Sequence, residues 1–126
     1  RVMFAGRRNE IERFYGASDL FILPTAYEPF PNVNLEAMAC GTPVMTTRTA
    51  GFADVVDEGR NGYLISDMYA VEEIATGIER HVSLSQSERQ VMADACWATA
   101  QAMTIEKNIQ QTLEMLEGVR REKLCA

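Results

Sequence analysis

The chain has 126 residues, of which 47% are hydrophobic and 24% charged, and its formal net charge is −6. This length suits one domain with a single core, and no apolar stretch approaches the roughly 20 residues needed to cross a bilayer. The acidic balance and the absence of a basic stripe argue against nucleic acid as a partner. The three cysteines, Cys40, Cys96 and Cys125, form no Cys-x-x-Cys pair. They predict a reduced, cytoplasmic environment without a disulfide framework or zinc site.

The first half of the chain alternates between strand-like and helical patterns. Residues 2–5 form a short apolar run that stops at Gly6, which predicts a strand feeding a loop. Residues 9–17 have apolar positions at helical spacing, with Asn9 as the expected N-cap. Residues 20–23 are continuously apolar and closed by a proline, a pattern typical of a buried parallel strand.

The same alternation continues through the middle of the chain. Residues 33–40 predict a helix, with Gly41 placed where a left-handed C-terminal cap belongs. Residues 44–47 predict a strand, residues 53–56 a short helical turn, and residues 63–65 a fourth strand.

The last part of the chain is helical throughout. Three segments, residues 70–82, 87–102 and 104–121, carry apolar side chains at helical spacing. Ser85 or Ser87 and Thr104 are the expected caps. The fold class is therefore α/β: a partial doubly wound, Rossmann-like parallel sheet of about four strands, followed by a helical C-terminal segment. So few strands lead us to expect that the first βα units are absent from this chain.

Ligands of open α/β sheets bind outside the carboxyl ends of the strands, which directs attention to the loops at residues 6–9, 25–32 and 48–53. In the middle loop and the helix after it, Glu28 and Glu36 stand with seven residues between them. A glutamate about one turn into a helix can accept hydrogen bonds from two ribose hydroxyls, as acidic residues do in dinucleotide folds. Glu28 would face the hydroxyls of a donor sugar.

The backbone between the two glutamates suits an anion. The N–H groups of Val33 and Asn34 at the helix start form a predicted pyrophosphate site. Two prolines stiffen the loop and leave the N–H groups of Phe30 and Asn32 free to point at a ligand. The plainer alternative is that each glutamate is an ordinary solvated charge, since the helix dipole alone favours acids near a helix start.

These residues resemble a known signature. Residues 28–44 are similar to the EX7E region of family 4 glycosyltransferases and their GT-B relatives, and residues 2–6, 17–24 and 50–65 resemble the strands and turns around it. The likeness covers about residues 1–80 and rests on the joint pattern, not on one residue. The chain departs from the family in having Pro31 where many members have glycine, and a single glycine, Gly51, in the next turn.

The resemblance implies a set of roles. It assigns the ribose to Glu36 and contact with the donor sugar, hence the catalytic role, to Glu28. It assigns the sugar and pyrophosphate cradle to the backbone of Phe30, Pro31, Asn32, Val33 and Asn34. It also implies that Gly6 ends the strand under the nucleotide base and that Arg7 lies in the loop bordering that base.

The expected function is that of the donor-binding part of a retaining glycosyltransferase that moves a hexose from a nucleotide-diphosphate sugar to a lipid-linked or saccharide acceptor. Cell-surface polysaccharide or lipopolysaccharide synthesis is the expected setting. No Asp-x-Asp motif occurs, so we expect metal-independent chemistry without a cofactor. The resemblance places the acceptor-binding N-terminal domain and a basic pyrophosphate-binding pair upstream of residue 1. Residues 1–126 are therefore expected to be the rest of the C-terminal domain and to be inactive alone.

The remaining expectations concern partners. The last helix carries an apolar stripe at Ile105, Ile109, Leu113 and Leu116, which predicts exposed apolar surface or self-association. Attachment to the inner membrane through the upstream domain is left open beside a cytoplasmic location. Two alternative functions are also left open: a GT-B-like sugar-nucleotide epimerase or phosphorylase, and a flavodoxin-like interaction domain without catalysis.

Overall fold

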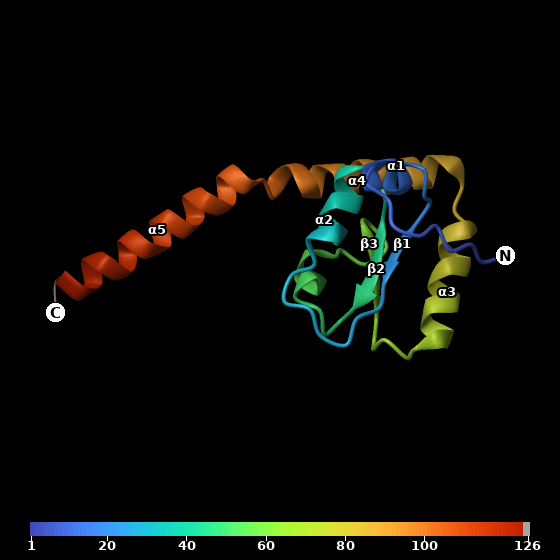
Figure 1. Cartoon of the computed structure of the whole chain (residues 1–126), viewed down its shortest axis with the longest axis horizontal. Helices are drawn as coiled ribbons and strands as arrows, with labels where there is room; N and C mark the ends of the chain where they lie inside the picture. The colour runs from blue at the N-terminus through green and yellow to red at the C-terminus, as the bar shows by residue number, and fades with distance from the viewer. Residues whose placement is uncertain (125–126) are drawn as a thin grey trace.

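The computed structural model describes residues 1–124, and at its centre lies a parallel sheet of three strands (Figure 1). The strands are β1 (Phe21–Leu23), β2 (Val44–Thr47) and β3 (Gly62–Ile65), and they lie in the order β1-β2-β3. Phe21 is in register with Val44, and Val44 with Gly62. The predicted α/β class with a parallel sheet is confirmed.

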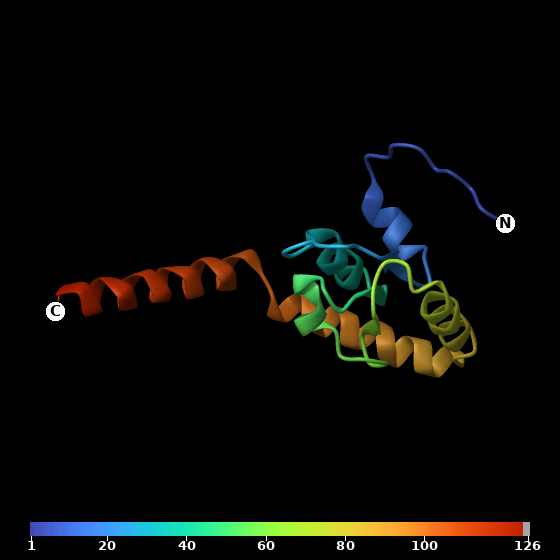
Figure 2. The same ribbon diagram turned by 90° about the horizontal axis from the view of Figure 1, so that it is seen from below.

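Helices cover both faces of this sheet (Figures 1 and 2). They are α1 (Ile11–Gly16), α2 (Asn32–Ala39), the 3-10 turn η1 (Gly51–Val55), α3 (Val71–Val82), α4 (Gln86–Ala102) and α5 (Ile105–Leu124). Side chains of a strand point alternately to its two faces, so Val44 joins the core under α1, α2, η1 and α4. Met45 joins a second core that includes Ile74 of α3 and Met92 of α4.

Two expectations about the sheet were wrong. Residues 2–5 form no strand: they pair with no strand in the described part of the chain, and Val2, Met3 and Phe4 are 78–98% exposed. An apolar run becomes a strand only where a neighbour supplies hydrogen bonds, so the sheet has three strands and not four. The segment at β1 is half-buried and not buried, because β1 is an edge strand with β2 on one side only.

The helix ends follow their local chemistry. Gly41 has a φ of +77° and donates its N–H to Met38, as a left-handed cap requires. Ser85 and Glu88 form a reciprocal capping box at the start of α4, and the Thr104 hydroxyl accepts from the Lys107 N–H in α5. Asn9 does not cap α1: the helix begins later, and its N-cap residue Glu10 makes no side-chain cap bond.

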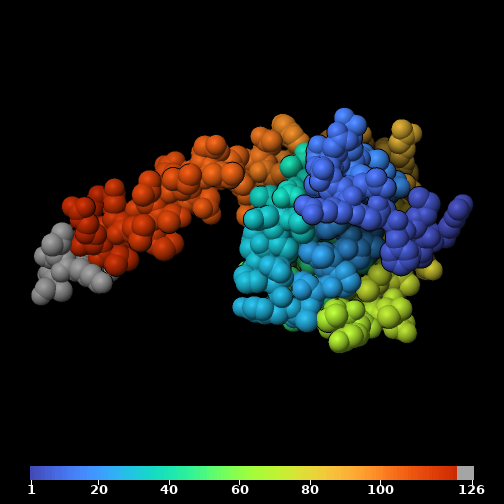
Figure 3. Space-filling model, viewed as in Figure 1, coloured from blue at the N-terminus to red at the C-terminus, as the bar shows by residue number. Residues whose placement is uncertain are grey.

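The last helix leaves the body of the molecule. Beyond Met103 the chain turns, and α5 runs outward as a rod (Figure 3). Its large apolar side chains between Ile105 and Val119 are 47–75% exposed. Among residues 1–124 no helix is both long and apolar enough to cross a membrane. The expected exposure of apolar surface on the last helix is confirmed.

Candidate functional site

Two of the three expected ligand loops lie together at the carboxyl edge of the sheet. Residues 24–31 connect β1 to α2, and residues 48–50 connect β2 to η1. Hydrogen bonds join these two loops and the residues that flank them in β1, β2 and η1, and we call this set of contacts the clasp. Its bonds run from Thr46 Oγ1 to the Leu23 carbonyl (3.1 Å), Thr47 Oγ1 to Thr25 (2.7 Å), Thr49 Oγ1 to Ala26 (3.4 Å) and the Gly51 N–H to Glu28 (2.9 Å).

Gly51 shows how closely the loops approach. A Cβ atom added there would lie 1.7 Å from the carbonyl oxygen of Pro29. Only glycine therefore lets the start of η1 lie against the Glu28 loop. This contact gives a physical reason for the one glycine retained in this turn.

An aromatic pair strengthens the same junction. The rings of Phe30 and Phe52 lie 5.1 Å apart at a tilt of 57°, and Phe52 is fully buried. Phe52 belongs to η1, so the loop before α2 packs on a fixed element. Such pairs contribute about 0.5–1.5 kcal/mol beyond the area they bury.

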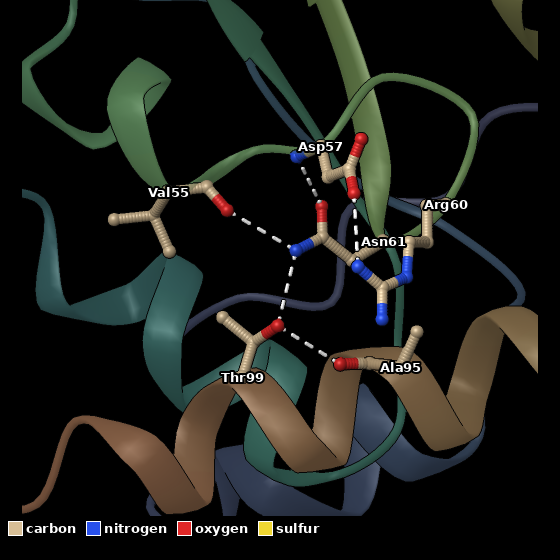
Figure 4. Close-up of polar contacts among 6 residues, drawn as sticks. All are labelled: Val55, Asp57, Arg60, Asn61, Ala95 and Thr99. Carbon is tan, nitrogen blue, oxygen red and sulfur yellow. Dashed lines mark hydrogen bonds and ion pairs between the residues drawn. The ribbon is translucent and has the colours of Figure 1, made fainter.

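The chain after η1 is fastened by the buried side chain of Asn61 (Figure 4). Its Oδ1 accepts from the N–H of Asp57 at 2.8 Å, and its Nδ2 donates to the carbonyl of Val55 and the hydroxyl of Thr99, each at 3.1 Å. The turn before β3 is thereby tied to α4. The element η1, which contacts the Glu28 loop, is therefore itself connected to α4 through Asn61.

The start of α2 is open to an anion. Its N-cap residue Pro31 offers no side-chain cap, and the first turn contains no acidic residue. The Asn34 N–H donates to the Pro31 carbonyl at 3.0 Å, whereas those of Phe30, Asn32 and Val33 have no hydrogen-bond partner within residues 1–124. Of the predicted Val33–Asn34 donor pair, the Asn34 N–H is therefore engaged within the helix start and the Val33 N–H is not, and the binding of an anion by this pair stays a prediction. Free N–H groups and the helix dipole together favour a negatively charged ligand here.

Glu36 lies on the exposed surface of α2, beside Tyr15 of α1. Burial, and then the neighbouring Glu36 carboxylate, raise the pKa of the Tyr15 hydroxyl. The phenol therefore stays neutral and can donate a hydrogen bond toward the carboxylate. Tyr15 falls within the helical pattern of residues 9–17, and that pattern gave no sign that it lies beside Glu36.

Glu28 lies in the exposed loop, and its backbone rather than its side chain is fixed. Its carbonyl accepts the Gly51 N–H, while its carboxylate makes no hydrogen bond or ion pair with residues 1–124. The carboxylate is free for a ligand. The roles proposed for Glu28 and Glu36 stay predictions.

Gly6 and Arg7 are not brought to this site. Both lie in the exposed N-terminal segment, where Gly6 has a φ of +65°. No hydrogen bond or ion pair of the described chain joins either residue to the Glu28 loop or to α2. Their assignment to the nucleotide base stays a prediction.

The side chain of Asn34 has a second feature that the sequence did not predict. The residue is completely buried, and neither its Oδ1 nor its Nδ2 has a hydrogen-bond partner. Leaving a buried polar group unsatisfied costs about 1–3 kcal/mol. The unpartnered amide therefore lowers the stability of the first turn of α2. Around it, within the described residues, no group of three or more His, Cys, Asp or Glu side chains could hold a metal.

The parallel sheet, the open start of α2 and the Glu28 loop at the carboxyl edge form the arrangement in which open α/β domains place their ligands. The sequence model of the family "Glycosyl transferases group 1" matches residues 1–96. The chain is 39% identical over 83 residues to a Rhizobium meliloti lipopolysaccharide core biosynthesis glycosyltransferase, LpsE, covering 66% of this chain and 24% of that protein. It is 30% identical over 119 residues to D-inositol 3-phosphate glycosyltransferase 2 of Catenulispora acidiphila, covering 90% and 28%.

Solved structures agree with the sequence relatives. Anabaena HepE, crystallised with UDP and glucose, matches with a TM-score of 0.81 and 32% identity, covering 94% of this chain and 32% of that one. The C-terminal domain of the group 1 glycosyl transferase LpcC from Francisella tularensis matches with a TM-score of 0.67 and 25% identity, covering 80% and 51%. The chain belongs to the group 1 glycosyl transferases, with the fold of a GT-B domain. It spans about a quarter of the length of the relatives LpsE and the inositol phosphate enzyme.

Proposed function

We propose that this chain is the part of a retaining, family 4 glycosyltransferase that binds the nucleotide-diphosphate sugar donor. The observation that carries the proposal is the uncapped start of α2, held between Glu28 and Glu36 by the clasp. Free N–H groups suit a pyrophosphate, and the two carboxylates suit the hydroxyls on either side of it. The likeness to Anabaena HepE, whose crystals contain UDP and UDP-glucose, supports this class of ligand.

The division of labour follows from position. Glu36, one turn into α2 and beside Tyr15, accepts hydrogen bonds from the ribose. The N–H groups of Asn32 and Val33 receive the pyrophosphate. Glu28, on the loop that leads into the helix start, contacts the donor sugar near the carbon that reacts. The leaving nucleotide is stabilised by the helix start and by basic groups upstream, without a metal ion or cofactor.

The proposal for the whole protein goes further than the donor site. The transferred group is a hexose, and the acceptor is lipid-linked or saccharide, bound by an N-terminal domain outside this chain. The relationship to the lipopolysaccharide core enzyme favours cell-surface polysaccharide or lipopolysaccharide synthesis, on the cytoplasmic side of the inner membrane. Residues 1–126 alone bind the donor weakly and transfer nothing. Glycosylated product formed by this chain alone would contradict that statement.

The experiment separates the two glutamates by calorimetry on the full-length protein. Glu36→Ala should weaken a nucleoside diphosphate and its sugar conjugate alike, by about 1.5–3 kcal/mol or roughly ten- to a hundredfold, since it removes bonds to two ribose hydroxyls. Glu28→Ala should leave the bare nucleotide nearly unaffected, weaken the sugar conjugate and depress turnover strongly.

The matched control is Glu114→Ala, which removes one carboxylate from the exposed surface of α5 and should change neither affinity. Equal weakening of the bare nucleotide by Glu28→Ala and Glu36→Ala would overturn the division of labour. Unchanged binding of both ligands by both variants would show that the glutamates are ordinary solvated charges.

A further inference from the structure

Tyr15, the buried residue of α1, is fixed through both its backbone and its ring. Its carbonyl accepts the Thr42 hydroxyl at 2.6 Å and the Ser18 N–H at 2.9 Å. Its ring lies edge-on to the ring of Phe21, with centroids 5.3 Å apart and planes at 84°. Only 5% of the residue is exposed, so the phenol has little freedom to move.

The hydroxyl end of this side chain lies beside the carboxylate of Glu36. Tyr15 packs in the same core cluster as Ala37 and Met38, which follow Glu36 in α2. Burial, then the charge of Glu36, and then a hydrogen bond with its carboxylate raise the pKa of the phenol. A carboxylate can only accept hydrogen bonds, so the neutral phenol is the donor of this pair.

The carboxylate of Glu36 has no cation to hold it. The residue is exposed on α2, and none of the ion pairs within residues 1–124 includes it. A glutamate side chain loses much rotamer freedom when it is ordered. A carboxylate that is already fixed in the free protein binds a ligand more tightly, because that freedom is not lost on binding.

We propose that Tyr15 is a positioning residue of the nucleotide site, whose hydroxyl donates to the Glu36 carboxylate and orients it for the ribose. This role rests on the proposed function, since it requires that Glu36 binds the ribose. A carboxylate has about four acceptor positions, so one bond from Tyr15 leaves room for two ribose hydroxyls. Tyr15 acts through Glu36 and not through contact with the ligand.

A neutral donor suits this role better than a cation. A lysine or arginine at the same place would form an ion pair with Glu36 and compete with the ribose for its oxygens. The phenol leaves the negative charge in place, and hydrogen bonds to a charged acceptor are stronger than those between neutral groups. We therefore expect the pair to favour nucleotides that carry both ribose hydroxyls.

The test is calorimetry on the full-length protein with two probes. The first is whichever of UDP, GDP and ADP the wild type binds most tightly, and the second is its 2′,3′-dideoxy analogue. Tyr15→Phe keeps the ring and removes the donor. It should raise the Kd for the first probe roughly three- to tenfold and leave that for the second within about twofold of the wild type. Equal effects on both probes, or no effect on the first, would overturn the proposal.

A double-mutant cycle shows whether Tyr15 acts through Glu36. Adding Tyr15→Phe to Glu36→Ala should cause no further loss of affinity for the first probe, and a second loss of the same factor would contradict the positioning role. The cycle also separates this role from the proposed function. If Glu36→Ala weakens both probes equally, the ribose contact itself is wrong. If Glu36→Ala is selective and Tyr15→Phe is silent, only the role of Tyr15 is wrong.

Tyr63→Phe is the matched control. Tyr63 is 3% exposed, and its hydroxyl lies 3.2 Å from Nδ1 of His81 in the second core, on the other face of the sheet. The variant loses the same phenol oxygen from an equally buried ring. It should change the Kd of neither probe, which separates a general effect of a lost buried hydroxyl from an effect on Glu36.

Thr42→Val disturbs Tyr15 in a second way, in case Tyr15→Phe does not fold. It removes the bond to the Tyr15 carbonyl and leaves the phenol in place. The Kd for the first probe should rise by up to about threefold, and that for the dideoxy analogue should not change. Circular dichroism checks the fold of each variant. Equal effects of Thr42→Val on the two probes, including none on either, would show that Tyr15 is an ordinary core residue.

Discussion

The body of the molecule and the α5 rod are built from similar residues but are stabilised in different ways. In the body, α2 lies against α4, and residues such as Met38, Phe52 and Cys96 are completely buried in one cluster. In the rod, the isoleucine, leucine and valine side chains at helical spacing between Ile105 and Val119 are 47–75% exposed. Apolar periodicity predicts a helix in both places, but only the presence of a facing element turns that periodicity into stability.

The two regions also differ in how polar groups are satisfied. Hydrogen bonds of the body connect residues far apart in the chain, such as Thr47 with Thr25 and Asn61 with Thr99. Those of α5 connect neighbouring turns, such as Gln110 with Glu114. Long-range bonds resist opening only as part of the whole core, whereas local ones open turn by turn. We therefore expect the body to unfold cooperatively and the unpaired rod to fray.

The largest expected contrast comes from truncating one apolar side chain in each region. Phe52→Ala leaves a cavity in the body and removes the support of Phe30, so it should lower the free energy of unfolding by about 3–5 kcal/mol. Leu116→Ala removes an exposed side chain and should change it by less than about 0.5 kcal/mol. Urea unfolding measures both. Losses of equal size would show that α5 belongs to the same cooperative unit.

Much of the fold could be predicted because its determinants are local. The cap at Gly41 depends on one positive φ, and the cap at Ser85 on a partner three residues later, so both are visible in the sequence. The failure at residues 2–5 has the opposite cause. That run is more apolar than residues 44–47, but only the run at residues 44–47 has strands on both sides. Strand pairing is a property of neighbours, which a short window of sequence does not contain.

The candidate site likewise has one part that is visible in the sequence and one part that is not. Glu28, Glu36 and the start of α2 could be singled out from the sequence, because a loop, two carboxylates and a helix start lie within one short stretch, and their roles stay predictions. The clasp was not, since the Thr46, Thr47 and Thr49 hydroxyls reach carbonyls 22 or 23 residues earlier in the chain. A run of threonines leaving a buried strand gives a weak signal for such contacts, because their hydroxyls can satisfy the backbone of an adjoining loop.

Two buried asparagines of the body provide the next test. Asn34 has no hydrogen bond for its carboxamide, so Asn34→Leu, which replaces it by an apolar side chain of similar size, should raise the free energy of unfolding by about 1 kcal/mol. Asn61→Leu leaves the groups that bond Asn61 unsatisfied and should lower it by about 2–3 kcal/mol. Thermal and urea unfolding measure both. A destabilised Asn34→Leu would show that Asn34 has a partner, such as a buried water.

The smallest expected effect comes from replacing one helical glycine by alanine in each region. Gly118 lies in α5, and no atom lies within 4 Å of a Cβ added there. Gly118→Ala should therefore stabilise α5 by about 0.5–1 kcal/mol, seen as higher helicity by circular dichroism. Gly77 lies in α3, where an added Cβ would come within 2.4 Å of the terminal methyl of Met45, a completely buried side chain. The same propensity gain is then offset by displacement of that methyl, so Gly77→Ala should bring no increase in stability, and a small loss is expected. The opposite result is that Gly77→Ala stabilises the body as much as Gly118→Ala stabilises α5. That result would show that α3 packs against the sheet more loosely than in the structure. The contrast between a packed body and an exposed rod would then be wrong for α3.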